Sequence, residues 1–388
     1  MKHICLLCLM MSAFVLPAWC EWKEPPPGLP DTFTIGLQAS DRIVDSDYAL
    51  AAQAGFNLVV PIRPGLEPSR ALLKACSAAG IKAVVWDSRF STYDMGDWAV
   101  YGQALADYRG SNAVAGYMAY DSITIPPARL PWMGWHMREL GGSAPNQFRY
   151  CELVPMNRVA PDSYRRYVRH YLESIAAFAL YEETDPFSAD ALNAMKITAG
   201  AADAEGKVWW RRCRLADTTP EMIRWQAYSA AAAGAKGIIY LIARPIDTGS
   251  PATSRSDSLL DPDGKPTGAF EAAKAVNARL TAIGPILMKA VKPAFYTTGT
   301  MPANVEPPAG APITAIQSSL EGDGFLVGML GAGDERYVMV VRKPSRGAEP
   351  ANLQLQFAAG VSATSVDSGK PAERLALLPG EGALLKIK

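Results

Sequence analysis

The sequence predicts a (β/α)8 barrel, an α/β fold, followed by a small C-terminal antiparallel β-sandwich. Eight apolar, strand-like runs are each followed by a segment of helical pattern, and together they have the length of about 250 residues that such a barrel needs. After about residue 292 the helical pattern stops and short alternating runs replace it. A doubly wound open sheet is the alternative. It usually has fewer strands, and the glycine-rich phosphate turn that often follows its first strand is missing here.

The first 20 residues have the features of a signal peptide. Lys2 precedes an apolar run from Ile4 to Val15, which is too short to span a bilayer. We therefore expect a secreted or periplasmic protein, with no transmembrane segment after signal removal. Lipidation of Cys20, which would make an outer-surface lipoprotein, is the less expected alternative. Residues 21–31 form a proline-rich leader without a core of its own.

The barrel is expected to cover residues 32–291. Its strands are predicted at residues 33–38, 56–62, 82–87, 114–120, 148–154, 176–181, 208–213 and 237–243. Its helices are predicted at residues 45–54, 67–80, 98–108, 127–140, 161–174, 189–204, 220–233 and 268–283. The strands are mostly continuous apolar runs, which is typical of parallel strands that are buried on both faces.

The second domain is expected to cover residues 292–388. Its strands are predicted at residues 295–300, 315–320, 325–330, 337–342, 353–357 and 382–387. These runs alternate between apolar and polar residues and are separated by Gly, Pro, Asn and Asp, with no helical pattern among them. This pattern predicts a sandwich of antiparallel sheets.

Composition excludes several classes of partner and cofactor. The 388 residues are 49% apolar, and 38 basic side chains balance 38 acidic ones, so no nucleic acid or anionic membrane surface is expected as a partner. After the signal only Cys76, Cys151, Cys213, His136 and His170 remain as cysteines and histidines. Their spacing fits no metal site, and a disulfide among the cysteines stays open. The sequence contains no GxSxG or P-loop motif, and no cofactor is expected.

Candidate functional residues lie where the predicted barrel strands end, because barrel enzymes act at that face. The polar candidates are Gln38, Asp87, Asp121, Glu152, Glu182, Arg211 and Arg244. The aromatic candidates are Trp86, Tyr120, Tyr181, Trp210 and Tyr240. Carboxylates hydrolyse glycosidic bonds in pairs, and aromatic faces stack on sugar rings. These residue types therefore favour a carbohydrate ligand.

Side chains alternate between the two faces of a strand, which limits how many of these candidates can face the barrel mouth. Arg211 and Arg212 point to opposite sides of one strand, so one of them faces the helices. Glu182 and Glu183 alternate in the same way, and at most one faces the mouth. Trp86, Trp209 and Trp210 are alternatively core residues.

Several stretches resemble secreted bacterial barrel proteins related to the β-galactosidase-like glycoside hydrolases of the clan A type. The stretches that carry the resemblance are 51–59, 72–87, 153–155 with 163–167, 221–228 with 234–238, 263–267 with Asn277 and 284–285, and 378–382. The resemblance implies a catalytic barrel with a carbohydrate substrate.

The catalytic positions depart from that family. The family usually reads Gly-Asp-Glu-Pro after the fourth strand, with the Glu as acid, and Ser122 stands at that position beside Asp121. The seventh strand, which holds the nucleophile in the relatives, carries no carboxylate. We therefore expect a different working pair, Asp121 and Glu182, with Glu152 assisting. The alternatives are a non-catalytic barrel that binds sugar, or a structural protein whose sandwich docks a partner.

Overall fold

The computed structural model describes most of the chain after the leader. The described residues are 31–40, 43–90, 98–120, 130–153, 156, 159, 161–175, 179–181, 185–215, 218–241, 243–244, 258–345 and 349–388. The predicted signal peptide therefore lies outside the described residues, as does all of the leader except Asp31.

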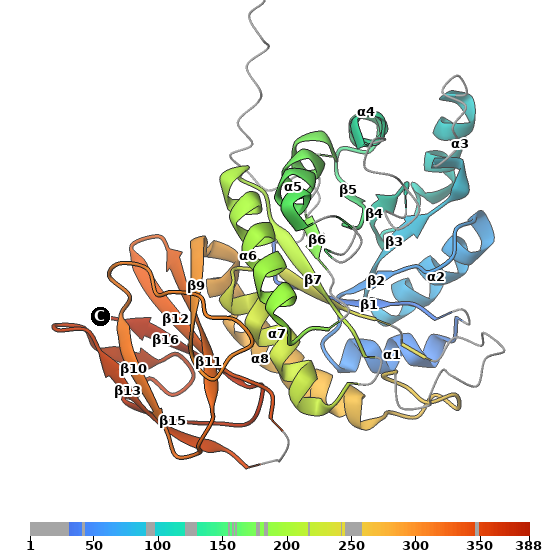
Figure 1. The fold of residues 1–388 in the computed structure, drawn as a ribbon. Helices are drawn as coiled ribbons and strands as arrows, with labels where there is room; N and C mark the ends of the chain where they lie inside the picture. The colour runs from blue at the N-terminus through green and yellow to red at the C-terminus, as the bar shows by residue number, and fades with distance from the viewer. Residues whose placement is uncertain are drawn as a thin grey trace, which may run out of the picture.

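The first part of the chain forms a curled sheet of eight parallel strands with helices on its outer side (Figure 1). The strands are β1 (Thr34–Gln38), β2 (Leu58–Val60), β3 (Lys82–Trp86), β4 (Val114–Met118), β5 (Phe148–Tyr150), β6 (Ala179–Tyr181), β7 (Trp209–Cys213) and β8 (Gly237–Tyr240). Their hydrogen-bonded order is β5-β4-β3-β2-β1-β8-β7-β6. Sequence neighbours thus pair side by side, as expected of a barrel-like α/β fold.

Each strand is followed by a helix, as the sequence pattern predicts. The helices are α1 (Asp45–Gln53), α2 (Leu66–Ala79), α3 (Trp98–Tyr108), α4 (Leu130–Ser143), α5 (Pro161–Ile175), α6 (Ala189–Ala204), α7 (Pro220–Ala232) and α8 (Gly268–Lys289), and the short 3-10 helix η1 (Ser88–Phe90) precedes α3. The predicted end of the last helix at Ile283 is wrong, because the helix continues through Pro285. Ile283 and Leu287 are both buried one turn apart, so the same apolar face continues past the proline.

On the inner face of the sheet, large side chains lie next to glycines of the neighbouring strands. Gly116 pairs with Phe148, and a Cβ at Gly116 would lie 2.4 Å from the Phe148 carbonyl oxygen and 2.9 Å from its ring. On the inner side Phe148 packs edge-to-face on Trp210, with ring centroids 5.6 Å apart. Gly237 pairs with Trp210, and its Cβ would lie 3.0 Å from the indole. Glycine at these positions therefore leaves room for the two aromatic rings.

We expect Gly116→Ala to lower the free energy of unfolding by about 1–3 kcal/mol, because the added methyl group overpacks the interior. Urea unfolding measures the change. Gly102→Ala in α3 is the matched control: its Cβ would have no neighbour within 4 Å, and the substitution should leave stability unchanged or raise it by about 0.5–1 kcal/mol. Equal stability of wild type and Gly116→Ala would contradict the packing described for this face.

The C-terminal part consists of two antiparallel sheets. Its strands are β9 (Val291–Gly299), β10 (Ile313–Ser318), β11 (Gly324–Ala332), β12 (Glu335–Arg342), β13 (Ala351–Phe357), β14 (Ala363–Ser365), β15 (Arg374–Leu377) and β16 (Gly382–Ile387). One sheet has the order β10-β13-β15 and the other β14-β16-β12-β11-β9. Buried residues of both sheets, among them Leu353 and Val340, form one apolar cluster. The sequence pattern misses β14 and β15, which are short and partly exposed.

This part packs against helices of the barrel-like part. Helix α7 contacts β11 and β12, and a Cβ at Gly328 would lie 2.0 Å from the carbonyl oxygen of Ala232. Arg279 of α8 also forms an ion pair with Asp367. The close backbone approach at Gly328 indicates that the two parts are packed together rather than linked loosely.

The described cysteines Cys76, Cys151 and Cys213 are buried free thiols. Burial raises the pKa of Cys76 and of Cys213 to about 12, so both stay protonated at neutral pH. No disulfide joins Cys76, Cys151 and Cys213 to one another.

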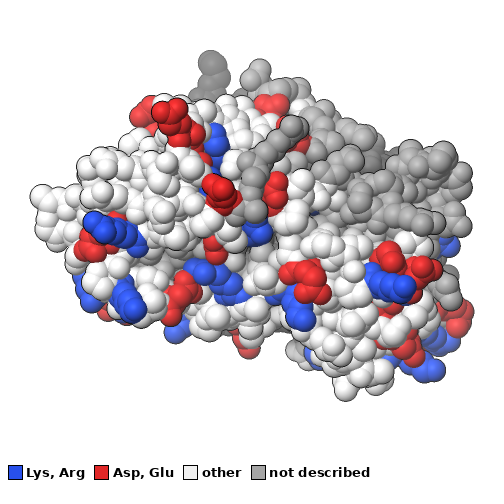
Figure 2. All heavy atoms as spheres, turned by 90° about the horizontal axis from the view of Figure 1, so that it is seen from below, with Lys and Arg blue, Asp and Glu red and all other residues white. Residues whose placement is uncertain are grey.

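The surface carries charges of both signs. Figure 2 shows Lys and Arg side chains interspersed with Asp and Glu side chains on the face seen from below. Within the described ranges, no helix combines the length and the apolar character that crossing a membrane requires.

Candidate functional site

The inner face of the sheet can be identified from the paired strands. Side chains of paired residues in a parallel sheet point to the same side. Because Phe148 and Trp210 meet inside, their partners and every second residue from them also face inward. This rule places three side chains on the inner face of the sheet. They are Trp86 at the C-terminal end of β3, Gln38 at the C-terminal end of β1, and Arg212 on β7. Trp86 and Gln38 are both half-buried.

A buried ion pair joins Glu152, just after β5, to Arg212 of β7. Arg212 Nη1 donates to Glu152 Oε2, and the Tyr150 hydroxyl donates to Glu152 Oε1 at 3.1 Å. The side chains of Arg212 and Glu152 are only 8% and 5% exposed. Burial first, and then the charge of Glu152, raise the pKa of Tyr150 well above its ordinary value, so Tyr150 remains a hydrogen-bond donor.

These contacts decide what Glu152 can do. A guanidinium and a hydroxyl donor both favour the ionised form of a carboxylate. Glu152 is therefore held as an anion that accepts hydrogen bonds. In this state it suits a base or an electrostatic role, whereas a general acid must carry a proton.

Arg211 lies on the other side of β7. Its guanidinium donates to Ser229 Oγ at 2.7 Å and to the Gln226 carbonyl at 3.2 Å, both on α7. Of the two consecutive arginines, the one on the inner face is therefore Arg212 rather than Arg211. The sequence alone left this choice open, because alternation gives the two sides of a strand but not which side is inner.

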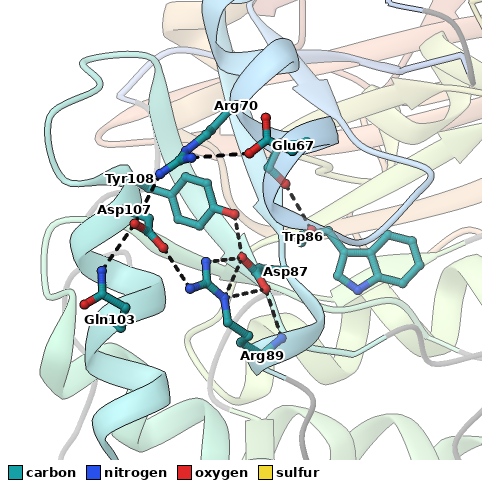
Figure 3. Close-up of polar contacts among 9 residues, drawn as sticks. Glu67, Arg70, Trp86, Asp87, Arg89, Gln103, Asp107 and Tyr108 are labelled. Atoms are coloured by element: carbon teal, nitrogen blue, oxygen red, sulfur yellow. Dashed lines mark hydrogen bonds and ion pairs between the residues drawn. The ribbon is translucent and has the colours of Figure 1, made fainter.

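Asp87 is also directed away from the inner face. Its carboxylate accepts hydrogen bonds from Arg89 Nη2 at 2.7 Å and from the Tyr108 hydroxyl at 2.5 Å (Figure 3). Burial alone would raise the pKa of Asp87, but the hydrogen bonds from Arg89 and Tyr108 outweigh it and the pKa is lowered. Asp87 therefore belongs to a network between β3 and α3, and the substrate contact expected from its place at a strand end is replaced by these protein contacts.

The network predicts a specific acid response. A carboxyl group with a lowered pKa in the folded state contributes stability that is present above its ordinary pKa of 3.8 and is lost as the pH falls through the lower folded value. We expect the unfolding free energy of wild type to fall more steeply between about pH 5 and 3 than that of Asp87→Asn. Urea unfolding along this pH series measures both slopes, and parallel curves would contradict an ionised Asp87.

Tyr120, just beyond β4, is bound to a residue that the sequence did not single out. Its hydroxyl hydrogen-bonds to Nδ1 of His136 on α4, and the two rings stack with centroids 5.8 Å apart. Burial lowers the pKa of His136, which is therefore neutral at pH 7. No local pattern signals this pair, because the two residues come from different elements of one βα unit.

Tyr240 and Arg244 hold the last unit of the sheet in place. Tyr240 is fully buried and packs edge-to-face on Phe56, with centroids 5.5 Å apart. It pairs with Cys213 on the same outer side as Arg211. Arg244 Nη2 donates to Asp47 Oδ1 of α1 at 2.6 Å, and its Nη1 donates to the Pro262 carbonyl at 2.9 Å. Both residues thus make protein contacts.

The two proposed catalytic residues, Asp121 and Glu182, lie outside the described residues, as does the side chain of Tyr181. The structure thus joins Glu152 to Arg212, and places Trp210, Gln38 and Trp86 on the same inner face. Among the described residues no group of three or more His, Cys, Asp or Glu side chains is arranged to hold a metal ion.

Comparison with known proteins identifies the fold. No family model matches the chain, and no curated protein matches its sequence. Among solved structures it is similar to a family 39 glycoside hydrolase from Bacteroides cellulosilyticus WH2, with a TM-score of 0.52 and 12% identity over 92% of this chain and 81% of that one. A GH30 endoxylanase from Clostridium papyrosolvens C71 has a TM-score of 0.47 and 12% identity, and covers 92% of this chain and 96% of its own.

A glucosidase from Croceicoccus marinus is more distant, with a TM-score of 0.43 and 9% identity over 94% of this chain and 98% of that one. The similarity to the family 39 glycoside hydrolase confirms, at the level of the fold, the sequence resemblance to barrel glycosidases. At 12% identity, the likeness to the family 39 enzyme establishes a shared fold and leaves the activity open.

Proposed function

We propose that the chain is an exported glycoside hydrolase that cleaves oligo- or polysaccharides at the mouth of its barrel. The observation that carries the proposal is the cluster at the inner ends of β5 and β7, where Glu152 is held by Arg212 and Tyr150 above the Trp210–Phe148 pair. Glycoside hydrolases use carboxylates in pairs, so a carboxylate fixed at the end of β5 supports a site of this kind at the same mouth.

Asp121 and Glu182 are the proposed catalytic pair. Asp121 directly follows Tyr120 after β4, and Glu182 directly follows β6. These positions are at the carboxyl ends of parallel strands, where barrel enzymes place their reacting groups. Since Arg212 and Tyr150 favour an ionised Glu152, the proton for the leaving group must come from another carboxyl group. Glu152 then assists by holding the Arg212 guanidinium in place at the barrel mouth.

Substrate contacts are proposed for the half-buried Gln38 and Trp86 and, from its place at a strand end, for Tyr181. Tyr120 and Trp210 are only 3% and 1% exposed, so the substrate contacts expected of them are replaced by packing in the interior. We further propose that β5 and β6 close the sheet into a complete (β/α)8 barrel and that the two C-terminal sheets form a β-sandwich. The eight-unit order and the common apolar cluster of the two sheets support these two assignments. Export is proposed from the signal-like first 20 residues.

A panel of 4-nitrophenyl α- and β-glycosides tests the proposed activity. We expect the mature chain to release 4-nitrophenol from at least one glycoside of the panel, and isothermal titration calorimetry to detect the matching free sugar. Release of nitrophenol at the rate of a buffer blank for every glycoside, together with no heat of binding for any sugar, would contradict a carbohydrate function altogether.

A non-catalytic sugar-binding barrel is the second candidate. It is favoured by a specific observation: β7 presents Arg212, and this arginine neutralises the one mouth carboxylate that the described residues include. Sugar binding in the calorimeter without any turnover of the matching glycoside would support this candidate and contradict the first.

A further inference from the structure

Trp86 is the last residue of β3, and its backbone is fixed from the helical side. Its carbonyl oxygen accepts hydrogen bonds from the Gly65 amide at 2.8 Å and from Ser69 Oγ at 3.0 Å. Ser69 lies in the first turn of α2. The chain is therefore held at the point where the indole leaves the strand toward the inner face.

The side chain of the next residue, Asp87, is held by more hydrogen bonds than the Trp86 carbonyl. Four donor atoms reach its carboxylate: the Arg89 amide nitrogen at 3.0 Å, Nε at 3.1 Å and Nη2 at 2.7 Å of the Arg89 guanidinium, and the Tyr108 hydroxyl. Arg89 is itself fixed by Asp107 of α3, whose Oδ2 accepts from Nη1 at 2.7 Å. The Asp87 side chain is 2% exposed, so water does not substitute for these partners.

The two consecutive residues point in opposite directions. Figure 3 shows the Trp86 indole directed away from Arg89 and Tyr108, while the Asp87 carboxylate lies between them. Because successive side chains of a strand alternate, fixing Asp87 on the outer side also fixes the direction of Trp86 on the inner side. Trp86 remains half-buried at the end of the strand.

We infer that Asp87, Arg89 and Tyr108 are positioning residues that hold Trp86 as a stacking platform for a sugar ring at the barrel mouth. The inference deepens the proposed function, on which its ligand depends. The sugar faces that suit an indole carry C–H groups, as in pyranosides with several equatorial hydroxyls. A binding side chain gains precision when surrounding hydrogen bonds fix its direction, which is the task of this network.

Fluorine NMR of full-length protein labelled with 5-fluorotryptophan tests the positioning without a ligand. The Trp86 resonance is the one that disappears in Trp86→Phe. We expect Asp87→Asn and the milder Tyr108→Phe to shift or broaden this resonance. Glu67→Gln should leave it unchanged, because Glu67 is 79% exposed at the outer end of the network and contacts only Arg70 among these residues.

An unchanged Trp86 resonance in both Asp87→Asn and Tyr108→Phe overturns the inference. Tyr108→Phe keeps the experiment decisive where Asp87→Asn does not fold, because it removes only the hydroxyl and keeps the buried aromatic ring.

The same variants test the platform with a 4-nitrophenyl glycoside that wild type hydrolyses, or with the free sugar that it binds. We expect Trp86→Ala to raise KM or Kd about two- to tenfold, from the loss of one aromatic contact. Tyr108→Phe should raise the same constant by a smaller factor with kcat unchanged, and Arg89→Lys should retain part of the wild-type value. Unchanged KM and Kd in Trp86→Ala would contradict the role of Trp86 as a stacking platform. Absence of any turnover or binding in wild type would instead remove the proposed function, while the NMR result on positioning still holds.

Discussion

Replacing Arg212 by methionine is expected to lower the free energy of unfolding by about 3–5 kcal/mol. The substitution removes the guanidinium that pairs with the Glu152 carboxylate, and the side chain of Glu152 is only 5% exposed. The Tyr150 hydroxyl would still donate a hydrogen bond to that carboxylate. Urea unfolding at pH 7, followed by tryptophan fluorescence, measures the loss.

Two variants control this experiment. Glu152→Leu combined with Arg212→Met removes both charges, and most of the lost stability should return because no buried charge is left. Arg169→Met breaks the Arg169–Glu173 ion pair, whose side chains are 68% and 35% exposed, and should change stability by no more than about 1 kcal/mol. A similar small effect for Arg212→Met would show that Glu152 and Arg212 are not a buried pair.

Replacing Asp121 by asparagine or Glu182 by glutamine is expected to reduce kcat at least about a thousandfold on any glycoside that wild type hydrolyses. Loss of a general acid, base or nucleophile removes a large part of the barrier reduction, and proton transfer alone contributes about 10²–10⁴-fold. Both substitutions keep the size and shape of the side chain, so thermal unfolding and sugar binding should stay close to wild type. Initial rates at saturating substrate measure the change.

Glu173→Gln is the matched control for these variants, because it removes a carboxylate from the exposed side of α5. Its kcat should equal that of wild type. Full activity of Asp121→Asn or of Glu182→Gln would remove that residue from the catalytic pair. The anomeric configuration of the first product, read by proton NMR, then reports the distance between the carboxyl groups: retention requires about 5–5.5 Å and inversion about 6.5–9.5 Å.

The architecture could be predicted because it depends on patterns that repeat along the chain. Eight apolar runs with intervening helical segments locate β1 to β8, and the order of the strands in the sheet follows the order of the chain. Element ends were less predictable. Pro285 normally ends a helix, yet α8 continues to Lys289, since burial of Leu287 outweighs the missing backbone hydrogen bond.

The site could be predicted less well, because its geometry depends on tertiary contacts. The sequence could place Asp87 at a strand end but could not show that Arg89 and Tyr108 bind its carboxylate on the outer side. It offered Arg211 and Arg212 as a pair of alternatives, and only tertiary contacts show which side is inner: Trp210 meets Phe148 on one side, and Arg211 contacts α7 on the other. Partners such as His136, which bind from a neighbouring helix, leave no local signal at all.

The most direct test of the proposed function is the release of 4-nitrophenol from the glycoside panel by wild type and by Asp121→Asn, measured side by side on protein of equal folded content. A hydrolytic barrel predicts release by wild type from at least one glycoside and loss of that release in Asp121→Asn. Binding of the free sugar by both proteins, with no release by either, would contradict it.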